Sequence, residues 1–81
     1  MIVITDFMLD VMRLRGDELL VYAVIYNHCH GSKQRWELDK EYISKTLGLT
    51  EQAIDSIIDN LCEKDMVAFE NSTTIYILDY E

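Results

Sequence analysis

The stretch LDKEYISKTLGLTEQAIDSIIDNL, residues 38–61, decides the fold of this chain. Asp39 and Thr50 are residues that favour helix N-caps, and Gly48 between them favours a helix end. The apolar residues of the second helix repeat at helical spacing: Ile54, Ile57, Ile58 and Leu61. Two capped helices joined by a short turn that contains glycine predict a helix-turn-helix over about residues 39–64.

The residues before this stretch predict two more helices. Thr5 or Asp6 can cap the first helix, and its apolar face is expected to consist of Phe7, Val11 and Leu14. Gly16 is expected to end it in the left-handed conformation, and Asp17 to cap the second helix. From Leu19 to Cys29 that helix is apolar almost all the way round, which is typical of a central helix covered on several sides.

The remaining segments predict a small β-sheet. Met1–Ile4 suits a short lead-in strand or a loose end, and residues 34–38, which contain Trp36, suit a short strand. Met66–Phe69 and Thr74–Tyr80 predict a C-terminal hairpin, the wing, over about residues 66–80. The fold class is therefore mainly α with a small β-sheet (α+β): one winged helix-turn-helix domain over residues 1–81, with four helices and a β-hairpin wing.

The last strand also suggests a route to self-association. Thr74–Tyr80 is rich in β-prone residues, and we expect it at a sheet edge. An uncovered edge pairs with other chains, so this strand is the main hint of a homodimer.

Charge is the most informative property of the composition. The formal net charge is −8, and it is unevenly distributed. Residues 1–40 hold five bases and six acids, whereas residues 41–81 hold two bases and nine acids. The second half should therefore repel a polyanion such as DNA, unless the few bases gather on one surface.

The sequence contains no pattern of a catalytic or metal site. His28, Cys29 and His30 are consecutive, and on a helix consecutive side chains diverge by about 100°, so we do not expect them to bind one ion together. Cys29 and Cys62 are expected to be buried and inert. The chain has no glycine-rich phosphate loop and no nucleophile motif, so we expect neither an enzyme nor a cofactor, metal or small-molecule substrate.

The sequence also predicts where the protein is located. No apolar run is long enough to cross a bilayer, and there is no targeting signal at the start, so a cytoplasmic, reducing environment is expected. The sequence leaves open whether residue 81 is a natural end or precedes a second domain.

Several stretches resemble the N-terminal winged helix of phage replisome organisers and DnaD-type replication initiators. The resemblance is carried by residues 7–10, 14–16, 18–26, 42–44, 47–50 and by Ile57, Ile58 and Leu61. It implies a winged helix that serves DNA binding, self-association at a replication origin, or both. By this resemblance Thr50–Lys64 is the recognition helix and residues 70–73 are the wing tip. Relatives usually carry Lys or Arg around that helix, whereas this chain carries mostly acids and amides.

Three sets of candidate contact residues follow. The recognition-helix face comprises Thr50, Glu51, Gln52, Asp55, Ser56 and Asp59. The wing tip comprises Asn71, Ser72 and Thr73. A basic patch would comprise Arg13, Arg15, Lys33 and Arg35, if the fold gathers them rather than using them to balance neighbouring acids.

Nucleic-acid binding is the leading hypothesis, and a protein-interaction module is the alternative. The fold favours a nucleic-acid-binding module of phage or mobile-element type, acting in replication initiation or transcription control. The charge favours a module that binds a protein partner or forms a homodimer without touching DNA, or an acidic mimic of DNA.

Overall fold

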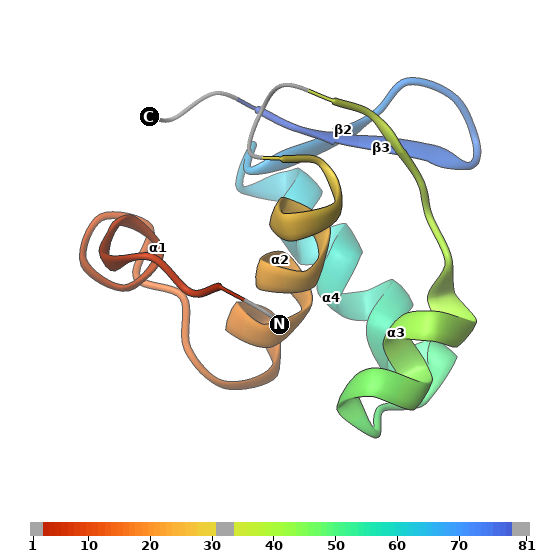
Figure 1. Ribbon diagram of the computed structural model, residues 1–81, viewed down its shortest axis with the longest axis horizontal. Helices are drawn as coiled ribbons and strands as arrows, with labels where there is room; N and C mark the ends of the chain where they lie inside the picture. Colours follow the sequence, from red (N-terminus) through yellow and green to blue (C-terminus); the bar gives the residue numbers. More distant parts are fainter. Residues whose placement is uncertain (1–2, 31–33, 79–81) are drawn as a thin grey trace.

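The computed structural model describes residues 3–30 and 34–78, and within them it contains four helices and a three-stranded antiparallel sheet (Figure 1). The order of elements is that of a winged-helix-like layout. They are α1 (Asp6–Asp10), α2 (Gly16–His28), β1 (Trp36–Glu37), α3 (Lys40–Leu47), α4 (Glu51–Glu63), β2 (Val67–Phe69) and β3 (Thr74–Ile77). The predicted α+β class is confirmed.

The first helix is shorter than its sequence suggests, and its predicted face is wrong. Thr5 caps it by accepting a hydrogen bond from the backbone N–H of Met8, but α1 ends at Asp10. The helical register therefore does not continue to Leu14. Met8 and Leu14 are fully buried, whereas Val11 is 64% exposed.

The start of α2 also differs from the prediction. Gly16 has the expected positive φ of 62°, yet it opens α2 rather than ending α1. The N-cap position is Arg15, which makes no capping hydrogen bond with its side chain, and Asp17 lies in the first turn. Here Asp17 favours the helix through its charge near the positive end of the helix dipole.

The centre of the molecule is α2, as its apolar sequence predicts. Five consecutive residues, 21–25, are buried, and α2 packs against α3, α4 and β3. The other fully buried core positions come from every part of the described chain: Met8, Leu14, Cys29, Ile43, Ile54, Leu61, Val67 and Ile75. One continuous core therefore holds helices and sheet together.

The helix-turn-helix has the predicted boundaries because local chemistry fixes them. The Asp39 carboxylate accepts from the Tyr42 N–H at 3.0 Å, and the Thr50 hydroxyl accepts from the Ala53 N–H at 3.1 Å. Gly48 ends α3 with a φ of 72°, a conformation that other residues adopt only with strain. The Ser44 hydroxyl donates to the Leu49 carbonyl at 2.5 Å and closes the turn.

The sheet has the order β1-β3-β2, so the last strand is central. Trp36 pairs with Ile75 on one side of β3, and Phe69 pairs with Ile75 on the other. The prediction that this strand lies at an edge, open to self-association, is therefore wrong. The strand is also shorter than predicted, ending at Ile77, and Tyr80 lies outside the described residues.

The chain before α1 is fixed by a side chain rather than by a strand. The Asn27 amide donates to the Val3 carbonyl at 3.1 Å and accepts from the Val3 N–H at 3.3 Å. Residues 3–5 form no strand, and residues 1–2 lie outside the described part. Among the helices that the structure describes, none is long and apolar enough to pass through a bilayer.

Candidate functional site

The outer face of α4 presents the predicted recognition-helix residues to solvent. Ile54, Ile58 and Leu61 face the core, so the opposite side of the same helix is exposed. All six predicted residues are exposed: Thr50, Glu51, Gln52, Asp55, Ser56 and Asp59. The structure thus brings this set together on one face of α4, with Thr50 at its start as the N-cap.

Four carboxylates form a line along this face, which we call the acidic stripe: Glu51, Asp55, Asp59 and Glu63. Each is four residues from the next, so neighbours lie on the same side of the helix. Like charges at this spacing destabilise a helix, and an acid in the last turn opposes the helix dipole. The last turn of α4 contains no base. Glu51, in the first turn, suits the helix dipole, and Asp55 pairs with Lys40, but helix stability does not explain Asp59 and Glu63.

The acidic stripe borders a groove of about 220 Å³ between α4, the start of α3 and the wing. Three kinds of side chain line it. Leu38, Ile58 and Phe69 are apolar, Ser72 and Thr73 are hydroxylic, and Lys40, Asp55 and Asp59 are charged. The groove joins segments that are as far apart in sequence as residues 38 and 73.

Two bases close to the groove and the wing are already paired with acids. Lys40 Nζ lies 2.8 Å from Asp55 Oδ1, and the hydrogen bond and charge of Asp55 raise the pKa of the Lys40 ammonium. Arg35 Nε lies 2.6 Å from Glu70 Oε1, and its guanidinium lies 4.7 Å from the centre of the Tyr76 ring. Neither base is therefore left as an uncompensated positive charge for a phosphate.

The wing tip is a structured turn, and its predicted residues are partly engaged in holding it. The side-chain oxygen Oδ1 of Asn71 accepts hydrogen bonds from the backbone N–H groups of Thr73 and Thr74, both at 2.9 Å. The Thr73 carbonyl in turn accepts from the Leu38 N–H at 2.8 Å. Asn71 thus stabilises the turn, while Ser72 and Thr73 line the groove.

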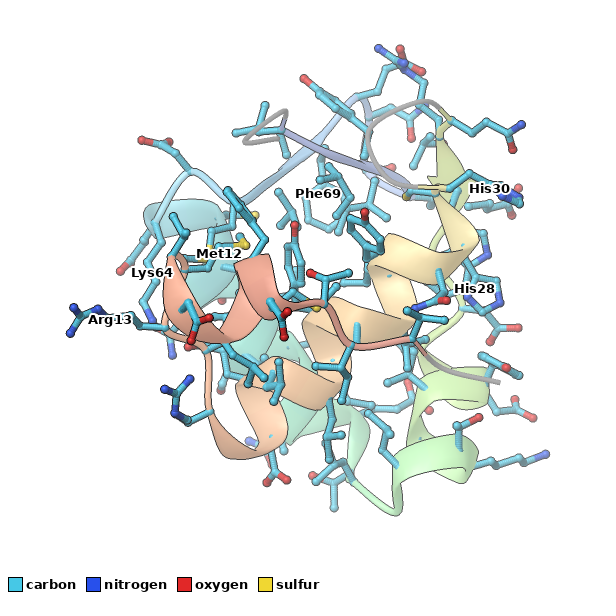
Figure 2. All side chains as sticks on the ribbon, turned by 60° about the vertical axis from the view of Figure 1, so that its left-hand side comes forward. Met12, Arg13, His28, His30, Lys64 and Phe69 are labelled. Atoms are coloured by element: carbon cyan, nitrogen blue, oxygen red, sulfur yellow. The ribbon has the colours of Figure 1, made fainter. Side chains whose placement is uncertain are left out.

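The predicted basic patch is divided between different parts of the molecule. Arg13 and Arg15 lie in the connection between α1 and α2, far in Figure 1 from the segment that enters β1 and contains Arg35. The Arg15 guanidinium donates to the carbonyls of Leu9 and Leu14, at 2.9 and 2.7 Å. Figure 2 shows Arg13 reaching outward on the side opposite His28 and His30. Lys33 lies outside the described residues.

The His28–Cys29–His30 run diverges at the end of α2. The His28 ring stacks on Trp36 with centroids 4.3 Å apart and contacts Tyr42 edge-on at 5.1 Å. Cys29 is fully buried, and His30 is exposed. Within residues 3–30 and 34–78, no three potential ligands gather around a point where a metal ion would fit.

Both cysteines lie at the ends of long helices and have weakly acidic thiols. Burial raises the pKa of the Cys29 thiol to about 11, and burial also raises the pKa of Cys62. Such thiols are poor nucleophiles near neutral pH. Cys62 is only half-buried, which differs from the predicted full burial.

Sequence reasoning missed four residues of this surface: Leu38, Lys40, Glu63 and Phe69. Glu63 was detectable, because the four-residue spacing of the stripe is visible in the sequence. The other three were not, since only the fold brings them beside α4.

Comparisons with family models, curated proteins and solved structures found no match to this chain. The candidate surface must therefore be interpreted from its own geometry and charge.

Proposed function

We propose that this chain is a non-catalytic interaction module that docks a basic protein surface through the outer face of α4 and the wing. One observation carries the proposal. The helix that occupies the recognition position in this layout presents the acidic stripe, and the nearby bases Lys40 and Arg35 are paired with Asp55 and Glu70.

Electrostatics favours a basic protein over DNA as the partner. Duplex DNA carries about one negative charge per 1.7 Å of its axis, and cationic side chains supply most of the affinity of proteins for it. The acidic stripe opposes that contact. The same stripe attracts a basic partner, accelerates the encounter and disfavours incorrect partners.

A homodimer through this surface is disfavoured by the same charges. In a symmetric dimer the two copies present the same patch to each other, so the acidic stripe of one copy would lie against the acidic stripe, or the residues next to it, of the other copy. Like charges across an interface are unfavourable. The partner is therefore a different, basic protein; where the partner's basic surface is itself a DNA-binding site, the module acts as a DNA mimic.

The environment of the thiols supports a cytoplasmic location. Both cysteines are free, Cys29 within the core and Cys62 half-buried. Unpaired thiols are usual in reducing compartments, whereas secreted domains of this size tend to carry disulfides.

A second candidate, nucleic-acid binding in replication initiation or transcription control, is supported by the order of the elements. A helix-turn-helix followed directly by a hairpin is the layout of many DNA readers. Gln52 on the exposed face suits adenine, and carboxylates there accept from cytosine. This candidate would require phosphate contacts from backbone amides.

The two candidates separate in one fluorescence anisotropy experiment across a salt series. The probes are a labelled mixed-sequence duplex, a labelled single strand and a labelled peptide rich in arginine and lysine. We expect the peptide to bind at low salt and neither DNA to bind at any salt. Tight DNA binding that weakens steeply with salt, without peptide binding, would reverse the assignment.

Charge reversal tests the same proposal from the other side. In the double variant Glu51→Lys and Asp59→Lys, the peptide should be released and the duplex should gain affinity at low salt. The matched control reverses Asp17 and Asp10, which are exposed but belong to α2 and α1 rather than to α4. Equal effects of both pairs would show that only net charge matters.

A further inference from the structure

The groove beside the acidic stripe has the size of a site for one side chain. Its volume of about 220 Å³ lies below the range of about 300–1,000 Å³ that is usual for cofactor and metabolite sites. It is also open along the surface formed by α4, the start of α3 and the wing, so a side chain carried by another protein can enter it.

The lining has two parts that match a long cationic side chain. Leu38, Ile58 and Phe69 offer apolar surface, and Phe69 is 39% exposed although it is a large aromatic residue. Asp55 and Asp59 stand one helical turn apart beside this apolar surface. Lysine and arginine bury an apolar stem while keeping a charged head near polar groups.

The wall of the groove already holds one cation of the chain itself. The Lys40 ammonium forms an ion pair with the Asp55 carboxylate, with 2.8 Å between Nζ and Oδ1. Among the described residues, no basic side chain lies within 4.0 Å of the Asp59 carboxylate. Asp59 therefore remains for a cation supplied by the partner.

Arginine suits this arrangement better than lysine. A guanidinium is planar, binds a carboxylate through two donors and stacks on an aromatic face, whereas an ammonium is a compact point charge. A carboxylate and an aromatic ring line the same groove here, as Asp59 and Phe69. Arg35 beside Glu70 and Tyr76 shows the same combination within this protein.

We infer that the groove receives an arginine side chain from the basic partner, with the guanidinium paired with Asp59 and stacked on Phe69, and the stem against Leu38 and Ile58. This inference rests on the proposed function and makes it specific: the general field of the stripe attracts the partner, and the groove selects one residue type.

The test compares two labelled peptides of equal charge. One carries a single arginine flanked by lysines, and in the other that arginine is replaced by lysine. We expect the arginine peptide to bind about two- to fivefold more tightly, the size of one cation–aromatic contact at an exposed site. Amide NMR signals of Asp59, Phe69 and Thr73 should move on its addition.

Two substitutions on α4 provide the matched pair. Asp59→Asn should weaken the arginine peptide about tenfold, the size of one charge-assisted hydrogen bond. Glu63→Gln removes the same charge one turn further along, outside the groove, and should weaken it much less. Both side chains are exposed, so folding should be preserved.

A second pair concerns the internal cation. Lys40→Met frees Asp55 and should strengthen the arginine peptide more than Lys45→Met does, although both remove one positive charge. Lys45 pairs with Glu41 on α3, away from the groove.

Equal binding of the two peptides, or equal losses in Asp59→Asn and Glu63→Gln, would overturn the arginine site while leaving the proposed function intact. If neither peptide binds at low salt, both the arginine site and the proposed function are overturned. Weaker binding of the arginine peptide in Asp59→Asn but not in Glu63→Gln supports both the arginine site and the proposed function.

Discussion

The helices α2 and α4 each contain 13 residues and pack against each other, yet their surfaces have opposite roles. In α2, five consecutive residues are buried, and the side chains complement the helix dipole, with Asp17 and Glu18 at its start and His28 at its end. In α4, only Ile54, Ile58 and Leu61 are buried, and an acid stands in the last turn. The composition of α2 follows from stability, whereas that of the outer face of α4 does not.

The two helices also carry a cysteine at corresponding places. Cys29 is the C-cap of α2 and fully buried, and Cys62 lies in the last turn of α4 and is half-buried. Lys64, at the end of α4, reaches back to Glu18 at the start of α2, with 2.8 Å between Nζ and Oε1. Substitutions at these residues can therefore test whether α2 serves mainly the core while α4 also presents a binding surface.

The largest expected effect is in the core of α2. Ile25→Ala should lower the free energy of unfolding by about 2–5 kcal/mol, because it removes buried methylenes and leaves a cavity. Ile25 is fully buried. Urea denaturation measures the change.

Ile54→Ala on the inner face of α4 is the matched variant, since Ile54 is also fully buried. A similar loss would show that the two inner faces are equivalent and that the helices differ only outside the core. A loss below about 1 kcal/mol for Ile25→Ala would contradict the central position of α2.

The next effect concerns the thiol at the end of α2. The pKa of Cys29 in the folded protein is about 11, above the ordinary value of 9.0. Since the unfolded chain releases this proton first, Cys29 makes the free energy of unfolding fall as pH rises from 9 to 11. Two pH units at 1.36 kcal/mol each set an upper bound of about 2.7 kcal/mol.

The measurement is the difference between wild type and Cys29→Ala in urea unfolding at pH 8, 9, 10 and about 11, because other groups titrate in both proteins. Their difference should shrink or change sign with rising pH. Cys62→Ala should alter the pH dependence less, as Cys62 is half-buried. A pH-independent difference for Cys29 would show that the thiol reaches solvent.

A smaller effect is expected at the start of α4. Thr50→Ala removes the capping bond to the Ala53 N–H and should lower stability by about 1 kcal/mol. Gln52→Ala, in the same turn, makes no capping bond and should change stability by less than about 0.5 kcal/mol. Thermal or urea unfolding of the two variants distinguishes capping from the general preference for alanine in helices.

These caps explain what could be predicted from the sequence. Asp39, Gly48 and Thr50 act on backbone groups within three or four residues, so the bounds of α3 and α4 were predicted almost to the residue. The burial of α2 was predicted for the same reason, because the eight consecutive apolar and aromatic residues Leu19–Tyr26 leave no polar face.

The predictions from sequence were wrong where contacts between distant segments determine which residues are buried or which strands pair. Met8 rather than Val11 enters the core because α1 ends early and Leu14 is placed by the loop. The last strand became central because Trp36, about forty residues earlier, pairs with Ile75. Likewise the exposed side of α4 was predicted from its spacing, but the groove was not, since Leu38 and Phe69 reach it through the fold.

The smallest effect has the opposite sign and tests the contrast most directly. Along the acidic stripe, neighbouring acids repel each other, and Glu63 lies at the negative end of the α4 dipole. Glu63→Gln should therefore raise the free energy of unfolding by about 0.3–1 kcal/mol at low salt, and Asp59→Asn by about 0.2–0.5 kcal/mol. Both gains should fade as salt is added.

The control for these gains is Asp17→Asn in α2, which removes a favourable charge near the positive end of that helix and should lower stability slightly. Opposite signs for the same chemical change would mean that Asp17 serves α2, while Asp59 and Glu63 are retained against the stability of α4. At the arginine site itself, Asp59→Asn is expected to lose binding while it gains stability. A loss of stability in Glu63→Gln and Asp59→Asn would instead make the stripe a structural feature, and would remove the strongest reason to regard it as a docking surface.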